Sequence, residues 1–499
     1  MLTRLKVTGF KNLVGVDVRF GPFTCIAGMN GVGKSNLFDA ITFLGAVADR
    51  PLVEAARSVR DETGRASDVR SLFHHIGDDY APEMSFEAEM IVPREGIDDL
   101  GQNARASITF LKYTLVLRYR GENGSLLGSL EILREDLVHI NLGDAIDSLR
   151  FPHSASWRKS AVTGRRTRSP FISTEGDGGA RLIKLHQDGR HGRPLSRSAE
   201  NLPRTVISAT NAAESPTALI ARNEMRSWRL LQLEPLSLRR SDEFSAPTKL
   251  GMDGSHLAAS LYHLAHSRIR NGRNGLDDTF ANRVYAQVAN RLSQLIDDVR
   301  TLGVDRDEKR ELLTLWVAGR DQTKHAARAL SDGTLRFLAL ATLEQDSESE
   351  GLLCLEEPEN GIHPARIPAM LRLLRDIATD AREEVGPDNP LRQVIVNTHS
   401  PSVVMQAPED SLVVAQLKDE VSEHGRFKAV TFRGLDGTWR QKQADERGIS
   451  RGELLAYLNP TGGNEDPQFA SMRDGPSHTR RVMDREDIQL LLFPQESHG

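Results

Sequence analysis

Residues 28 to 35 have the residue types and spacing of a phosphate-binding loop. They read Gly28-Met29-Asn30-Gly31-Val32-Gly33-Lys34-Ser35, a full match to the pattern G-x-x-x-x-G-K-[ST]. In such a loop backbone N–H groups point at phosphate oxygens, the lysine reaches the outer phosphates and the hydroxyl binds Mg²⁺. The sequence therefore predicts a nucleoside triphosphate and Mg²⁺ as ligands. The candidate binding residues are Gly28, Asn30, Gly31, Gly33, Lys34, Ser35 and Asn36, with Ser35 on the metal.

The segments on either side of this loop fit that prediction. The apolar stretch Phe23–Ala27 precedes it and is typical of a buried strand, whereas residues 36–41 have apolar side chains at helical spacing. A glycine-rich turn can match the pattern by chance. The strand before the loop and the helix after it favour a working phosphate site.

A second candidate cluster follows the short apolar run Leu352–Leu355, which ends at Glu356 and Glu357. A strand that delivers two acids at its carboxyl end suits Mg²⁺-dependent triphosphate hydrolysis. The first acid would hold Mg²⁺ and the second would orient and polarise the attacking water. Pro358 and Gly361 would end the strand sharply.

Two further segments contribute candidate residues. Ser331 is a good N-cap for the helix that follows, and Gly333 would let an anion approach that helix N-terminus, although an ordinary capped helix has the same pattern. His399 follows the apolar strand 394–398, one strand–helix–strand unit after the acids, where it can reach a γ-phosphate. A lone histidine in such a place is more often structural.

The four motifs in this order resemble the ABC-type ATPases, within them the branch of SMC, RecF and OLD-family proteins. The finer pattern is similar to the AAA-type ATPases of bacterial defence and toxin-like operons. The resemblance rests on residues 10–13, 330–336, 356–364 and 397–401, and on 233–235 followed by 253–257. It covers about residues 1–55 and 225–415, and it implies an α/β fold: a P-loop ABC-type ATPase core with an added antiparallel β-sheet and an inserted α-helical lobe.

The resemblance also implies roles for individual residues. Glu356 stands where most relatives have the Walker B aspartate, and Glu357 would be the catalytic base. Ser331 and Gly333 would form the signature motif that meets the γ-phosphate held by another protomer, and His399 the switch histidine. No glutamine-loop residue is identifiable; His74, His75 or Asp78 are candidates. Lys11 would either touch phosphate or be a solvated turn lysine.

The family topology places strand 394–398 between the phosphate-loop strand and the acidic strand. Cys25 and Cys354, the two cysteines of the chain, should therefore not lie on adjacent strands. Both lie in apolar strand candidates, so we expect buried thiols rather than a disulfide or metal site.

Composition sets outer limits on class and location. The chain has 499 residues, 39% of them apolar, and 64 basic against 69 acidic residues give a formal net charge of −5. Two or three lobes are expected at this length, and any nucleic-acid surface must be local. No window approaches the 18 apolar residues of a membrane span, and the N-terminus lacks a signal-peptide pattern, so we expect a cytoplasmic protein without membrane contact.

We expect five regions along the chain. Residues 1–150 would form the N-terminal ATPase lobe, 151–205 a basic flexible insertion, 206–300 a helical lobe, 301–415 the C-terminal ATPase lobe and 416–499 an extension. Residues 151–195 hold nine Lys or Arg and three acids; a solvated loop is favoured over a DNA-contacting surface. Residues 434–439 indicate a hairpin turn, and residues 484–493 are a docking tail for a partner or pack on their own domain.

The resemblance implies an ATP-driven dimer switch in which two ATP molecules lie between two protomers. The chain resembles ATPase subunits of antiphage defence systems such as Septu or PARIS, which implies control of a separate effector such as a nuclease. The alternatives are a RecF-type DNA-repair clamp, an OLD-like nuclease and a transporter ATPase. The last two are disfavoured because the sequence shows neither a TOPRIM motif nor a membrane segment.

Overall fold

The structure is a computed structural model that describes most of the chain. The described residues are 1–59, 69–121, 129–166, 169–176, 181–189, 193–200, 202–266, 278–346, 350–422, 425–443 and 448–458. The expected tail at 484–493 lies outside them. No helix in these ranges is long and apolar enough to cross a membrane.

The centre of the molecule is a six-stranded sheet with the order β14-β19-β20-β3-β21-β22. Its strands are β14 (Arg229–Leu231), β19 (Gly351–Glu356), β20 (Arg392–Thr398), β3 (Phe23–Ala27), β21 (Leu412–Ser422) and β22 (Gly425–Gly434). The first five are mutually parallel, and β22 is antiparallel to β21. β20 separates β3 from β19, so Cys25 and Cys354 lie on strands that are not neighbours, as predicted.

A second, antiparallel sheet has eight strands in the order β13-β12-β11-β10-β9-β6-β1-β2. They are β13 (Leu195–Ser198), β12 (Leu182–Leu185), β11 (Ile172–Glu175), β10 (Ser129–His139), β9 (Phe110–Arg120), β6 (Glu83–Ile91), β1 (Leu2–Thr8) and β2 (Val16–Arg19). Two short hairpins accompany it: β4 (His75–Ile76) with β5 (Asp79–Tyr80), and β7 (Glu95–Ile97) with β8 (Asn103–Arg105). The predicted antiparallel sheet beside the nucleotide core is therefore present.

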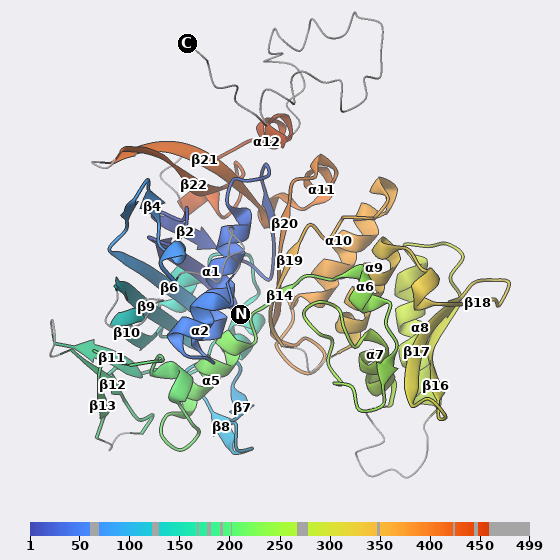
Figure 1. Cartoon of the computed structure of the whole chain (residues 1–499), viewed down its shortest axis with the longest axis horizontal. Coiled ribbons are helices and arrows are strands. Elements are labelled where there is room, and N and C mark those ends of the chain that lie inside the picture. Colours follow the sequence, from blue (N-terminus) through green and yellow to red (C-terminus); the bar gives the residue numbers. More distant parts are fainter. Residues whose placement is uncertain are drawn as a thin grey trace, which may run out of the picture. The chain divides into compact units, whose positions relative to one another are not determined.

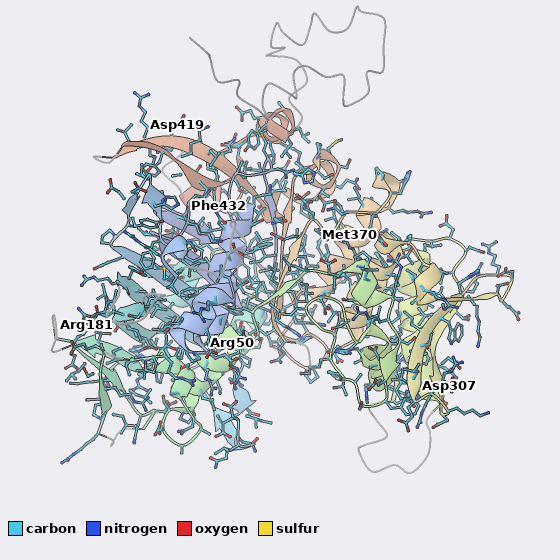
Figure 2. The ribbon with its side chains drawn as sticks, viewed as in Figure 1. Arg50, Arg181, Asp307, Met370, Asp419 and Phe432 are labelled. Carbon is cyan, nitrogen blue, oxygen red and sulfur yellow. The ribbon has the colours of Figure 1, made fainter. Side chains whose placement is uncertain are left out.

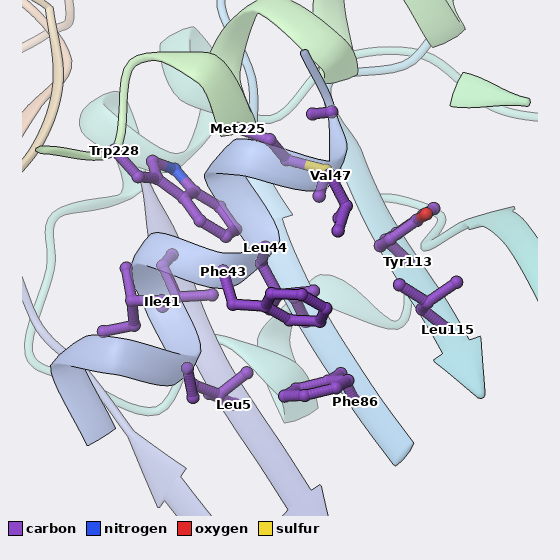
Figure 3. Close-up of a cluster of buried hydrophobic side chains, with 14 of the residues drawn as sticks. Leu5, Ile41, Phe43, Leu44, Val47, Phe86, Tyr113, Leu115, Met225 and Trp228 are labelled. Atoms are coloured by element: carbon purple, nitrogen blue, oxygen red, sulfur yellow. The ribbon is translucent and has the colours of Figure 1, made fainter. Parts of the chain in front are cut away.

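Helix α1 (Lys34–Val47) packs against both sheets, because its apolar residues surround most of its circumference. Figure 3 shows Phe43 of α1 pointing toward Phe86 of β6, and their ring centroids are 5.4 Å apart. Side chains alternate across β3: Ile26 joins this cluster, whereas Cys25 and Ala27 join a second cluster on the other face of the sheet. The helix that starts at the phosphate loop is thus held by a dry core.

The second cluster contains α9 (Asp332–Gln345), α10 (Ile367–Ile377), α11 (Pro401–Gln406) and their neighbours α7 (Leu257–His266) and α8 (Asp278–Ser293). Met370 of α10, labelled in Figure 2, is completely buried in it. A small sheet lies against α7 and α8, with β15 (Asp242–Glu243), β17 (Leu312–Ala318), β16 (Thr301–Asp307) and β18 (Lys324–Ala326). The remaining helices are α2 (Leu52–Arg57), α3 (Ala145–Ser148), α4 (Ala155–Ala161), α5 (Pro216–Arg226), α6 (Pro235–Leu238) and α12 (Arg451–Leu458).

Residues 206–300, which we expected to form one helical lobe, are divided between two parts of the fold. Helix α5 packs on α1 and β14 is an edge strand of the central sheet, so residues 216–231 belong to the ATPase core. The lobe that follows is mixed, because α7 and α8 cover one face of the small sheet (Figure 1). β14 has only three residues, too few to show a periodic pattern in the sequence, so the strand was not predicted.

The solvated loop that we expected at residues 151–195 is wrong for the described part. Strands β11 and β12, followed by β13, extend the eight-stranded sheet. Several of the basic side chains are engaged: Arg181, labelled in Figure 2, donates to Glu131 at 3.3 Å, and Lys184 pairs with Glu175 at 2.5 Å. These strands also bury Ile172, Ile183 and Leu185 in the core, but each has only four residues, too few to show a periodic pattern in the sequence.

The hairpin turn expected at residues 434–439 is also wrong. The hairpin of this region joins β21 to β22 near residues 422–425, and the Asp436-Gly437 turn comes after β22 has ended. The turn is held from elsewhere, since Asp436 N donates to Ile449 O at 3.1 Å.

One completely buried acid predicts how the stability of the fold depends on pH. Glu135 of β10 accepts hydrogen bonds from the backbone N–H groups of Val206 and Ile207, and burial raises its pKa from 4.5 to about 7. The folded state therefore holds this proton more tightly than the unfolded state. The contribution of Glu135 to the free energy of unfolding is therefore greatest below pH 4.5. This contribution falls by about 3 kcal/mol as the pH rises through 7.

We expect the free energy of unfolding of the wild type to fall relative to that of Glu135→Gln between pH 5 and pH 8. The glutamine variant has no proton to lose at this position, so its constant loss of one hydrogen bond does not change with pH. Urea denaturation of both proteins at the two pH values measures the difference. Parallel pH profiles would contradict the assignment to Glu135.

Candidate active site

The phosphate-binding loop connects β3 to α1 in a shape that requires glycine. Gly31 and Gly33 have φ values of 77° and 103°, in the region where side chains are strained. A Cβ on Gly28 would lie 2.6 Å from Ala415 O. Asn12 supports the loop from below, because its amide donates to Val32 O at 3.2 Å and accepts from Asn36 Nδ2 at 2.9 Å.

Lys34, in the first turn of α1, is 6% exposed. Its ammonium donates to Gly28 O at 2.6 Å and Met29 O at 2.7 Å, so it lies within the loop itself. Burial lowers the pKa of Lys34, and the nearby acids Glu357, Glu359 and Glu356 oppose that shift. A charged ammonium held by carbonyls can exchange them for phosphate oxygens at small cost.

The two acids lie at the carboxyl end of β19, next to β20 and its neighbour β3. Glu356 is the last residue of the strand and accepts from Asn397 Nδ2 at 3.3 Å. Glu357 has a φ of 46°, which is strained for a side chain other than glycine. Its N–H donates to Asn397 O at 3.1 Å, which pins this conformation. Strain that the surroundings enforce in this way is typical of functional positions.

Both carboxylate oxygens of Glu357 are held. His399 Nδ1 lies 2.6 Å from Oε1, and Asn360 Nδ2 donates to Oε2 at 2.9 Å. The structure therefore brings together Glu357 and His399, which the sequence placed 42 positions apart. A carboxylate oriented by two partners is suited to accept a proton from water.

One hollow of about 420 Å³ joins these parts. It is lined by Asn30, Gly31, Gly33, Lys34, Ser35, Asn36, Arg336, Glu356, Glu357, Asn360 and Asn397. Six of the seven predicted loop residues and both acids thus face one space; Gly28 is beneath it. Ser35 and Glu356 supply a hydroxyl and a carboxylate, the oxygen donors that Mg²⁺ prefers, so these residues fit the expected metal.

Ser331 and Gly333 do not line this hollow. Ser331 is exposed and caps α9, accepting from Thr334 N at 3.3 Å, as predicted for an N-cap. Gly333 is buried, and a Cβ there would lie 2.2 Å from Gly361 O. Because Gly333 has no side chain, α9 can pack closely on the loop after the acids. This packing is a second reason for glycine at this position, besides the predicted approach of an anion.

Sequence reasoning missed Gln232, which directly follows β14. β14 is the parallel neighbour of β19, so Gln232 emerges at the same sheet edge as the acids. A second hollow of about 250 Å³ is lined by Gln232, Glu234, Arg336, Glu356 and Glu357 among others. The apolar signal before Gln232 is only Leu230-Leu231, too short to predict a strand.

Arg336 of α9 borders both hollows. Its Nε donates to Leu233 O and its Nη1 to Asn360 O, each at 3.1 Å. At the other end of α9, Arg392 Nη1 from β20 donates to Leu343 O at 2.8 Å. The helix is thus tied to the loop after β14, to the loop after the acids and to the strand before His399.

The expected glutamine-loop candidates lie elsewhere. His74 Nδ1 is 2.7 Å from Lys11 O and its ring packs on Phe427, and neither His74, His75 nor Asp78 lines either hollow. Lys11 is not a solvated turn lysine, because its ammonium donates to the buried Asp39 carboxylate at 2.8 Å. This ion pair fixes the turn that carries Asn12. The contact of Lys11 with phosphate stays a prediction.

Glu359 is a third acid near the site, 7% exposed. Thr398 donates to its Oε1, and its Oε2 has no hydrogen-bond partner among the described residues. Burial raises the pKa of Glu359, and the Thr398 hydrogen bond opposes that shift. Its nearness to Lys34 and His399 makes it part of the charge balance of the site.

Gly333→Ala is expected to destabilise the fold, because the new methyl group would overlap Gly361 O, a backbone atom that cannot rotate away. Overpacking of this kind costs about 1–3 kcal/mol. Gly386→Ala is the matched control, since a Cβ there meets nothing within 4 Å. Denaturant midpoints of the two variants and the wild type give the comparison; equal midpoints would contradict the packing role of Gly333.

Comparison with known proteins adds one family match. A family described as "AAA domain, putative AbiEii toxin, Type IV TA system" matches residues 147–405, more than half of the chain. The matched region holds α9, the acids and His399, and it begins after the phosphate-binding loop. No curated protein sequence is significantly similar.

Similar solved structures are SMC head domains. One bound to the C-terminal winged-helix domain of ScpA is 13% identical, with 86% of this chain and 97% of that chain covered and a TM-score of 0.42. Those from Thermotoga maritima and Pyrococcus furiosus are 13% and 12% identical, cover 87% and 86% of this chain and 99% and 96% of theirs, and have TM-scores of 0.35 and 0.40. Similarity this low carries no argument about function. The family model, by contrast, matches more than half of the chain, so the chain belongs to this family of AAA-domain ATPases.

Proposed function

We propose that this protein is an ATP-binding and ATP-hydrolysing dimer switch that controls a separate effector, a nuclease or toxin, in a prokaryotic antiphage defence complex. The observation that carries the switch is a division of the site. The phosphate loop and both acids line one hollow, whereas Ser331 lies exposed at the N-terminus of α9 and outside that hollow. A second copy is the natural source of the missing contact.

Exposed apolar side chains support a contact face. Met29 belongs to the phosphate loop and is 40% exposed. Leu236 of α6 is 75% exposed, and α6 is bounded by Arg239, which pairs with Asp332 at the start of α9. Met252, 56% exposed, accepts at its carbonyl from Gln232 N. Apolar side chains thus flank both halves of the proposed composite site, where a second protomer would cover them.

In the proposed reaction, the Lys34 ammonium leaves its loop carbonyls for the β- and γ-phosphates. Ser35 and Glu356 would hold Mg²⁺, which would neutralise charge on the phosphates. Glu357 takes a proton from water as the water oxygen attacks the γ-phosphorus and the bond to the β-phosphate oxygen breaks. ADP and phosphate remain. His399 and Asn360 orient Glu357 in this step, and Gln232 would fill the glutamine-loop role beside the acids.

The family match supports the proposed defence role. The description of the matched family names a toxin of a toxin–antitoxin system, which supports a regulatory partner protein. A RecF-type clamp that holds DNA through residues 151–195 is less supported, because Arg181 and Lys184 already pair with carboxylates.

Glu357→Gln is expected to raise the mass of the particle in the presence of ATP and Mg²⁺, because the amide cannot accept the proton and ATP stays bound between protomers. Light scattering with and without ATP measures the mass. The wild type should form the larger species only transiently. If the mass is unchanged while ATP binding is shown directly, the self-driven dimer switch is wrong.

A second substitution tests the proposed face. Leu236→Glu in the Glu357→Gln background should abolish the larger species, because it places a carboxylate in an apolar contact. Val421→Glu is the matched control, since Val421 is 76% exposed on β21, away from the site. Equal loss in both would show that added charge, rather than the face, is responsible.

Gln232→Ala should lower kcat for ATP hydrolysis about 10- to 100-fold and raise the Mg²⁺ concentration needed, with ATP affinity little changed. His74→Ala should leave the Mg²⁺ requirement unchanged. Steady-state ATPase rates over a Mg²⁺ titration give both values. A Mg²⁺ requirement that moves in His74→Ala and not in Gln232→Ala would reverse the assignment.

A further inference from the structure

The small sheet ends on an open strand. β16 pairs along its whole length with β17, and within the described residues no strand pairs with its other edge. Such an edge presents backbone N–H and C=O groups to its surroundings and can pair with an added strand. β16 lies on the right in Figure 1, in the lobe that also contains α8.

A hollow of about 450 Å³ runs along this edge. It is lined by the five consecutive residues 300–304, by Tyr285 and Ala286 of α8, and by Trp316 of β17. Leu315 and Val317 are buried toward the helices, so Trp316 between them points to the opposite face.

Gly303 allows this arrangement. It pairs with Trp316 across the strands, and a Cβ on it would lie 2.9 Å from Cζ2 of the indole. Without a side chain there, the ring lies against the edge strand and borders the groove. The Arg300 N–H already donates to Ala318 O at 3.0 Å, and Tyr285 approaches the backbone of Val304, so an added strand would pair with residues 301–303.

The groove continues into a second hollow of about 430 Å³ that shares Arg300, Thr301 and Trp316 with the first. Arg320 and Lys324 also line it, so the two hollows have three cations between them and no carboxylate among their described lining residues. Asp298 approaches Arg320 only at 3.9 Å, with both side chains about 70% exposed, which makes a weak pair. The charge therefore favours an acidic occupant.

The geometry favours a peptide over a nucleic acid. The Lys324 ammonium lies 4.1 Å from the centroid of the Trp316 ring, and the ring also packs on Gly303. The stacking surface that an unpaired base would need is thus already used. A strand edge that borders a groove, by contrast, matches an extended backbone.

We propose that β16 and its groove dock an extended, acidic segment of a partner protein, which adds to the sheet as a further strand. The inference stands apart from ATP hydrolysis, since none of its residues borders the nucleotide hollow. It has a direct connection to the ATPase core, because Arg291 of α8 donates to Glu344 of α9 at 2.8 Å. A segment bound against α8 would therefore contact the helix that is ion-paired to α9.

The test uses the full chain and a fluorescent peptide of about ten residues that alternates glutamate and valine. Fluorescence polarisation should show saturable binding. Lys324→Glu together with Arg300→Glu should weaken it at least about tenfold, and Ala286→Trp, which fills the groove, should also weaken it. Arg310→Glu is the matched control, because Arg310 is 78% exposed at the far end of the same sheet.

A peptide with proline at alternate positions separates strand pairing from charge, since proline cannot donate to a ladder. It should bind at least about tenfold more weakly than the probe; equal binding would overturn the added strand. Binding of single-stranded oligothymidylate that is lost in Arg300→Glu would overturn the peptide assignment. Displacement of the probe by a peptide copying residues 482–495 would assign the groove to the chain's own tail instead.

Discussion

The site depends on one constraint: four parallel strands must end at the same edge of a buried sheet. β14, β19, β20 and β3 are neighbours in this order, so Gln232, the two acids, Asn397 with His399, and the phosphate loop all emerge together. Parallel strands of this kind need both faces covered. Helix α1 and the antiparallel sheet cover one face, and α9 and α10 cover the other.

Hydrogen bonds between neighbouring strand ends then set the finer geometry. Asn397 is bonded to both Glu356 and Glu357, and His399 to Glu357, so strand β20 orients the acids of β19. Arg336 and Arg392 tie α9 to the loops and the strand around it. A second protomer that displaced α9 would therefore also move the loop that carries Asn360 and change the orientation of Glu357. In the proposed dimer, this movement would couple assembly to hydrolysis.

The small sheet shows the opposite arrangement. Its inner face is covered by α7 and α8, but its edge strand and outer face carry Trp316 and three lysine or arginine residues around a groove. The central sheet of the ATPase core has both faces covered, whereas this lobe leaves a strand edge beside a groove. The two parts are therefore suited to different tasks, one to nucleotide chemistry and one to recognition.

Residue spacing alone predicted the phosphate loop, the acidic strand and the N-cap at Ser331. These three features are local, and each has a short-range pattern. The position of β20 between β3 and β19 followed instead from the resemblance to ABC-type ATPases. Gln232 had no such pattern, and Asn12 and Arg336 entered only through the resemblance, because each acts through a partner far along the chain. The strands of residues 172–198 were missed because each has only four residues, too few to show a periodic pattern. Tertiary structure alone decided which polar residues meet, because that depends on strand order and on helix packing across hundreds of residues.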